Sequence, residues 1–260
     1  HANGVANHNY QVVDGGICTC LYAGYPNLYL QFDKPNEFIY QPDWYRDIEY
    51  AKERERGYDS TEDLYVPGYF ELDIKKGESV VFSASTSEIE PATLHDLFAK
   101  EVAERTPRDN FFHCLVNAAH QFHIHEKNGD RYILAGYPWF KCRARDMFIA
   151  LPGLTLSINE RDYFELVMET AMRGLQEFMA GQPLSVKIAE IEQPDVMLWA
   201  VWCIQQYAKD AGLKACQSRY GELLHAILSF IESGHHPHLT LKENGLVYTE
   251  GHEKPMTWMN

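Results

Sequence analysis

The spacing of apolar residues changes at Pro91, and this change limits the folds open to the chain. Before Pro91, apolar and polar residues alternate in short segments such as 28–32 and 79–83, a pattern typical of half-buried strands. After it, apolar residues recur every three or four positions, as on one face of a helix. We therefore expect an α+β protein, with one domain at residues 1–88 and a second at 89–260.

The N-terminal part is punctuated by glycine and proline, which favours short antiparallel strands, and we expect part of a β-sandwich. Residues 75–78 are predicted to form a hairpin-like turn between strands at 69–74 and 79–83. The segment 43–63 is rich in charged residues, and we interpret it as a solvated loop or a short helix.

The C-terminal part predicts about six helices between Pro91 and Gly234. Residues 196–204 are apolar on nearly every side of such a helix, so we expect this helix to pack between others. Gly234 is predicted to end the last helix, since a glycine often adopts the left-handed conformation there. The clearest helical stripes lie at 93–105, 110–123, 164–179 and 223–231.

The charge excludes some classes of partner. With 37 acidic against 23 basic residues, the formal net charge is −14, and no basic block is present. We therefore expect neither nucleic acid nor an anionic membrane as a partner. The longest strongly apolar run, residues 196–204, is short of the roughly 18 residues that span a bilayer. Six cysteines are too sparse for a disulfide scaffold, and no signal peptide is visible, so we expect reduced thiols and a cytoplasmic protein.

Histidines gather in two places, and each could be read as a metal site. Only Glu126 offers a further ligand close in sequence to the first cluster, and the spacing matches no known zinc motif. The second cluster follows a helix end, where imidazoles interact favourably with the last carbonyls. Structural roles are thus the favoured interpretation, with metal binding as the alternative. The clusters are His120, His123 and His125, and His235, His236 and His238.

Nucleotide-binding glycine motifs and the serine-hydrolase elbow are absent from the sequence. What remains is a set of aromatic and charged residues at predicted helix starts or in loops. Sugar-binding sites use such groups, because aromatic rings pack against the apolar faces of sugars while carboxylates and Arg bind hydroxyls. The alternative is that the aspartates are ordinary helix N-terminal residues. The set comprises Trp139, Arg145, Asp146, Asp195 and Trp258.

Several segments, taken in order, resemble the glycogen debranching enzyme (amylo-α-1,6-glucosidase) family. The resemblance covers the end of that family's N-terminal β domain and the first part of its glucosidase domain. In the first part the similar segments are 3–7, 24–26, 53–57 and 67–71. In the second they are Ile133–Phe140, Arg145–Leu154, Asp195–Trp199 and Thr257–Met259.

The resemblance implies a β-sandwich followed by part of an (α/α)6 toroid. It implies hydrolysis of the single α-1,6-linked glucose left at a glycogen branch, with inversion of configuration. Inversion requires a carboxylic acid and a carboxylate base about 6.5–9.5 Å apart, so that a water molecule fits between base and sugar. Glycogen or a branched α-glucan would be the partner, and no metal ion or organic cofactor is expected.

Matched position by position, the resemblance also assigns roles in substrate binding. Arg145 and Asp146 would clamp hydroxyls of the terminal glucose. Trp139 and Trp258 would be platforms for sugar rings. Asp195 would be a further hydrogen-bonding group of the pocket, or simply a helix cap.

The sequence departs from the family at two places. Asn260 stands where the family has its general acid, and an amide cannot donate a titratable proton. Residues 141–144 replace a stretch that contains Gly and Trp in the family. We expect the general base beyond residue 260 and, because six helices fill only part of a toroid, an exposed apolar seam through which copies would associate. The hydrolysis is therefore predicted to be impaired, and the alternatives are a non-catalytic glycogen-binding protein and a purely structural module.

Overall fold

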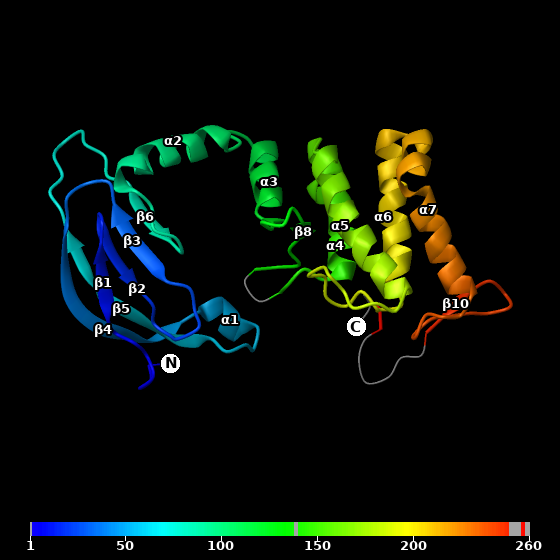
Figure 1. Ribbon diagram of the computed structural model, residues 1–260, viewed down its shortest axis with the longest axis horizontal. Coiled ribbons are helices and arrows are strands. Elements are labelled where there is room, and N and C mark those ends of the chain that lie inside the picture. Colours follow the sequence, from blue (N-terminus) through cyan, green and yellow to red (C-terminus); the bar gives the residue numbers. More distant parts are fainter. Residues whose placement is uncertain (1, 138–139, 250–255, 258–260) are drawn as a thin grey trace. The chain divides into compact units, whose positions relative to one another are not determined.

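A computed structural model describes residues 2–137, 140–249 and 256–257 (Figure 1). The chain divides into two compact units, His1–Arg105 and Thr106–Asn260. Antiparallel strands and helices are both present, which confirms the α+β class. The domain boundary between residues 88 and 89 stays a prediction. Within the described part of the chain, no helix has the length and apolar character needed to cross a membrane.

The first unit contains a four-stranded antiparallel sheet of order β1-β2-β3-β6. The turn between its first two strands needs Gly15, whose φ is +71°. Gly16 follows, where any Cβ would overlap the carbonyl oxygen of Leu30 in the adjacent strand. The four strands are β1 (Tyr10–Val13), β2 (Gly16–Thr19), β3 (Leu28–Phe32) and β6 (Phe82–Ser85).

A long two-stranded ribbon, β4 (Glu37–Glu49) with β5 (Thr61–Glu71), forms the second sheet of this unit. It packs on the first sheet through aromatic rings, with the centroids of Phe32 and Phe70 5.0 Å apart. Much of segment 43–63 is therefore strand, and the loop interpretation is wrong there. The short helix is confirmed as α1 (Ala51–Glu55). Much of the ribbon is exposed, so the alternation that marks a half-buried strand is weak in its sequence.

The predicted hairpin at 75–78 is partly wrong. The turn itself forms, with the backbone N–H of Glu78 donating to the carbonyl of Lys75 at 3.0 Å. The strands on either side do not pair with each other, because β5 pairs with β4 while β6 pairs with β3. The turn thus connects two sheets, and the β-sandwich stays a prediction. A short 3-10 turn (Pro91–Thr93) and α2 (Leu94–Glu104) complete the first unit.

The second unit is mainly helical, and its helices confirm the apolar spacing seen in the sequence. Two small hairpins accompany them, β7 (His123–His125) with β8 (Arg131–Ile133) and β9 (Thr240–Leu241) with β10 (Val247–Tyr248). A short 3-10 turn spans Leu156–Ile158. The helices are α3 (Phe111–His120), α4 (Ala144–Leu154), α5 (Arg161–Met179), α6 (Val196–Ala211) and α7 (Leu213–Glu232).

The core of the second unit lies between the last four helices. Helix α6 packs against both α4 and α7, as its apolar sequence predicts. It is not surrounded, however, because Leu198 and Trp202 remain exposed on one face. The expected apolar seam, and association through it, stay predictions. Gly234 follows α7 with φ +70°, which confirms its predicted place after the last helix.

The six cysteines are all free, as predicted. Burial raises the pKa of the Cys142 thiol to about 11, so this thiol is protonated at neutral pH. Burial likewise raises the pKa of Cys203 and Cys216. These thiols fill space in the core, and the cytoplasmic location remains a prediction.

Candidate functional site

Arg145 and Asp195 form a bidentate ion pair between the beginnings of α4 and α6. The Nε of Arg145 donates to Oδ2 of Asp195 at 2.8 Å, and its Nη2 donates to Oδ1 at 2.9 Å. The indole Nε1 of Trp199 donates to the same Oδ2 at 3.1 Å. The two charged side chains are only 14% and 11% exposed. A rigid polar network thus holds the two helix starts together.

Asp195 immediately precedes α6, but its side chain makes no capping hydrogen bond to the first turn. The sequence left two roles open for Asp195, a hydrogen-bonding group of the pocket or a helix cap. The structure does not show the capping role. The carboxylate instead faces Arg145 across 50 positions of sequence. Sequence motifs placed both residues in one site, and the structure does bring them together.

A second ion pair reinforces the start of α4. The guanidinium of Arg143 donates three hydrogen bonds to Glu190, at 2.6 to 3.0 Å. This pairing raises the pKa of Arg143 above its usual value. Alongside it, the backbone N–H of Ala144 donates to the carbonyl of Ala189 at 2.9 Å. The loop before α6 is therefore fastened to the start of α4, and Figure 1 shows this loop in yellow-green near the beginning of α6.

The side chains of Asp146 and Arg145 point in different directions, because adjacent positions on a helix lie on different faces. Its side chain is 48% exposed, and its Oδ2 lies 3.8 Å from Nε of Arg143. No donor within the described ranges is hydrogen-bonded to this carboxylate. It borders an open hollow of about 290 Å³ that is otherwise lined by apolar residues. These are Phe122, Leu134, Ala135, Ile149, Ala150 and Leu154.

Arg145 and Asp146 were expected to clamp the sugar hydroxyls together, but their side chains have different surroundings. Arg145 is engaged with Asp195, while Asp146 faces the hollow. Trp139, Trp258 and Asn260 lie outside the described residues, and their assigned roles stay predictions. Sequence reasoning missed the Arg143–Glu190 pair, since residues 141–144 were noted only as a departure from the family.

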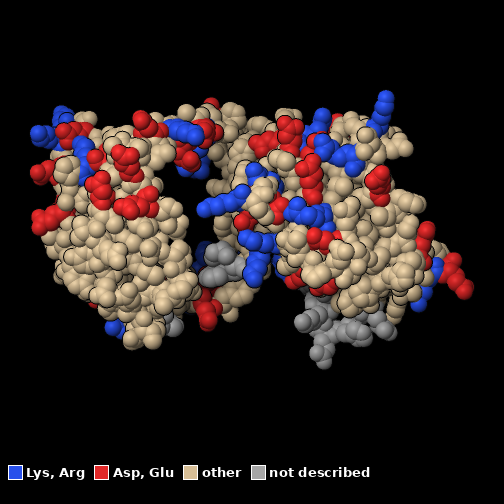
Figure 2. Space-filling view, in the orientation of Figure 1, with Lys and Arg blue, Asp and Glu red and all other residues tan. Residues whose placement is uncertain are grey.

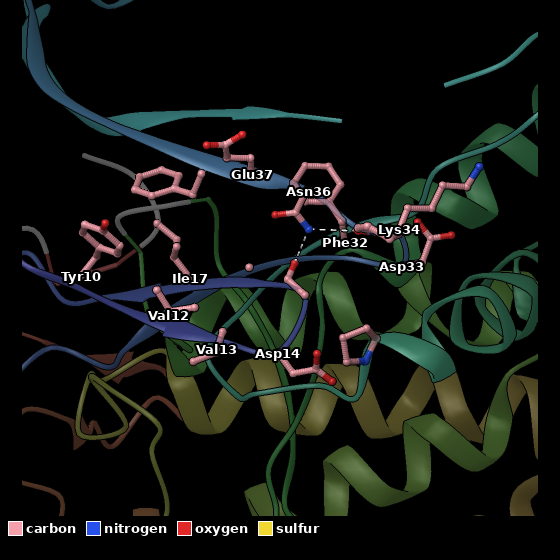
Figure 3. A pocket seen from close by; sticks show the side chains of 15 residues that line it. Tyr10, Val12, Val13, Asp14, Ile17, Phe32, Asp33, Lys34, Asn36 and Glu37 are labelled. Atoms are coloured by element: carbon pink, nitrogen blue, oxygen red, sulfur yellow. Dashed lines mark hydrogen bonds between the residues drawn. The ribbon is translucent and has the colours of Figure 1, made fainter. Parts of the chain in front are cut away.

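The first unit has its own open hollow, of about 530 Å³, between its β1–β2 turn and the start of β4 (Figure 3). Two of its polar side chains, Asn36 and Lys34, are engaged within the protein. Asn36 donates to the carbonyls of Gly15 and Lys34 at 2.9 and 3.0 Å, and the Lys34 ammonium pairs with Glu78 at 2.9 Å. We place the candidate site in the second unit, because the motif residues Arg145, Asp146 and Asp195 lie there.

The charge distribution differs between the two units on the face drawn in Figure 2. Acidic and basic side chains are intermingled over the helical unit, whereas a broad part of the first unit carries no charged side chain. Within the candidate site, charged side chains are likewise paired with opposite charges, Arg143 with Glu190 and Arg145 with Asp195.

Comparison with known families identifies both parts of the chain. Residues 116–260 match the family described as amylo-alpha-1,6-glucosidase, and residues 1–81 match the N-terminal part of glycogen debranching enzyme. Searches of curated proteins and of solved structures returned no match. The match of residues 116–260 places the chain in a class of glycoside hydrolases. More particularly, the chain belongs to the glycogen debranching enzyme family.

Proposed function

We propose that the helical unit binds the α-1,6-linked glucose at a glycogen branch, at the mouth formed by the starts of α4 and α6. We further propose that these helices form part of an (α/α)6 toroid. The observation that carries the proposal is the Asp146 carboxylate, which borders an apolar hollow beside the rigid Arg145–Asp195 pair. Membership of a glycogen-debranching family supports glycogen as the substrate.

The hollow suits a small sugar unit. Its volume of about 290 Å³ is near the lower end of the range of ligand pockets, about 300 Å³. Phe122 and Ile149 offer apolar surface to the C–H face of a sugar ring. The carboxylate of Asp146 can accept hydrogen bonds from two adjacent hydroxyls, because its ion-pair partner Arg143, 3.8 Å away, is not hydrogen-bonded to it. Arg145, held by Asp195, fixes the orientation of the helix start that carries Asp146.

Hydrolysis in this proposal follows the inverting, two-carboxylate course of the family. One carboxylic acid protonates the glycosidic oxygen, and a carboxylate activates water on the opposite face of the sugar. Asn260 occupies the position of that acid, and its amide has no proton of suitable acidity to give. We therefore propose that glucose release by this chain is impaired. Trp139 and Trp258 are proposed as platforms for the sugar rings.

The same asparagine favours a second candidate function, a non-catalytic protein that binds α-glucan. Glucose release from a limit dextrin trimmed to single α-1,6-linked glucose stubs separates the candidates. Release of β-glucose at an ordinary enzymatic rate would show a working acid elsewhere in the chain and contradict the impairment. Slow but measurable release would support the impaired glucosidase, and binding without any release would support the non-catalytic role.

Replacing Asp146 by asparagine should weaken binding of isomaltose, a disaccharide with the α-1,6 linkage, by about tenfold. A hydrogen bond to a charged group contributes about 1.5–3 kcal/mol, and part of it survives with a neutral amide. Titration calorimetry measures the change. Asp162→Asn is the matched control, because Asp162 occupies the first turn of α5 as Asp146 does that of α4. Equal affinities of wild type and Asp146→Asn would refute the assignment of this carboxylate.

A further inference from the structure

Two histidines and a glutamate from separate segments meet beside the end of α4. His120 ends α3, His123 begins β7, and Glu160 precedes α5. The Nε2 of His120 lies 2.5 Å from Oε1 of Glu160, and Nδ1 of His123 lies 3.8 Å from Oε2. One ligand atom from each residue lies within 4.8 Å of the other two. Sequence spacing could not reveal the cluster, because Glu160 follows His120 by 40 positions.

The protonation of His123 follows from its neighbours. Its Nε2 lies 3.0 Å from the carbonyl oxygen of Leu154, which can only accept a hydrogen bond. In the neutral ring the hydrogen is therefore on Nε2. The side chain is 6% exposed, and Tyr163 stacks on the ring at a centroid distance of 4.0 Å. The lone pair of Nδ1 is thus held toward Glu160.

Two hydrogen-bond acceptors, the lone pair of His123 Nδ1 and the Oε2 atom of Glu160, therefore face each other 3.8 Å apart. Two such groups repel each other unless a cation or a donor lies between them. Histidines that bind metal commonly donate their other ring N–H to a backbone carbonyl, as His123 does to Leu154. The ring orientation and tautomer required of a metal ligand are therefore already set by the fold.

We propose that His120, His123 and Glu160 bind a divalent transition metal ion, with Zn²⁺ the preferred ion. Two imidazoles and a carboxylate are a known zinc ligand set, and they leave a coordination position for water. The side chains of His120 and Glu160 are 39% and 34% exposed, which gives an ion access from solvent. The ion would tie the end of α3 and the start of β7 to the start of α5. This site goes beyond the proposed function, and sugar binding does not require it.

Titration of the chelator-treated 260-residue chain with Zn²⁺ alone tests the proposal. We expect Glu160→Gln and His120→Ala each to raise the zinc dissociation constant at least about tenfold. Even the loss of a side chain that only hydrogen-bonds to a metal ligand weakens metal affinity by about that factor or more. His125→Ala is the matched control, because this neighbouring histidine is not among the three ligands, and its constant should stay within about twofold of wild type. An unchanged constant in Glu160→Gln, or a loss only in His125→Ala, would overturn the proposal.

A second measurement protects the test against misfolded variants. Zn²⁺ should raise the melting temperature of the wild-type chain, since an ion that binds only the folded state stabilises it. It should leave the melting temperature of His120→Ala almost unchanged. Absence of any shift in the wild type, together with absence of binding heat, would contradict the site without reliance on a variant.

Discussion

Replacing Arg145 by alanine should lower the free energy of unfolding of the helical unit by about 3–5 kcal/mol. The substitution removes both charged hydrogen bonds to Asp195 and leaves that carboxylate, 11% exposed, with the Trp199 indole as its remaining partner. A buried charge without its counter-ion is costly, because the interior solvates it poorly. Urea unfolding followed by circular dichroism measures the loss.

The Arg161–Asp210 pair provides the control. Its Nε–Oδ2 distance of 2.7 Å is nearly the same, but both residues are exposed. Arg161→Ala should therefore cost far less than Arg145→Ala, since water replaces the lost partner. A double variant, Arg145→Met with Asp195→Leu, should recover part of the loss because no charge remains unpaired. Equal losses in Arg145→Ala and Arg161→Ala would show that burial of the first pair has no energetic consequence.

His236 should make the stability of the chain depend on pH below neutrality. Its side chain is buried between Phe178 and Phe230, and burial lowers its pKa from 6.5 to about 4, with the neighbouring His238 adding to the effect. Its Nδ1 accepts from the backbone N–H of His238 at 3.1 Å. Nε2 has no hydrogen-bond partner among the residues that the structure describes.

The sign follows from proton binding. Between pH 6.5 and about 4 the unfolded chain binds a proton at this position and the folded chain does not, so stability is complete above pH 6.5 and falls as the pH decreases. The loss in the free energy of unfolding that is attributable to His236 is at most about 3 kcal/mol, because a shift of one pKa unit corresponds to about 1.36 kcal/mol. His236→Leu should lose less stability than wild type between pH 7 and pH 4. His235→Phe, at an exposed position, should keep the wild-type dependence, and identical curves for wild type and His236→Leu would refute the assignment.

Local spacing predicted the helices well. The stripe at 164–179 became α5, and the stripe at 223–231 became part of α7, because each carries an apolar face long enough to be unambiguous. Most of the ribbon of β4 and β5 was missed for the opposite reason. Neither strand contains a fully buried residue, so the alternation that marks a half-buried strand is weak. Their pairing also joins positions that are distant in sequence.

The sequence placed Arg145 and Asp195 in one site, and the structure pairs them, but the sequence did not predict the contacts that each side chain makes. Motifs placed Arg145, Asp146 and Asp195 together, yet helix geometry sends the first to Asp195 and the second to the hollow. Arg143 and Glu190 were missed because their contact depends on how the loop before α6 folds back. Contacts between distant segments depend on tertiary structure, which single-sequence spacing does not contain.

Hydrogen exchange with and without isomaltose tests most directly whether the starts of α4 and α6 form the glucan site. The account predicts slower exchange of backbone amides within residues 143–150 and 189–199 when the sugar is bound, because binding suppresses local opening there. It predicts no change in residues 10–37, which border the hollow of the first unit. Protection confined to residues 10–37, or no protection at any saturating concentration, would contradict the account.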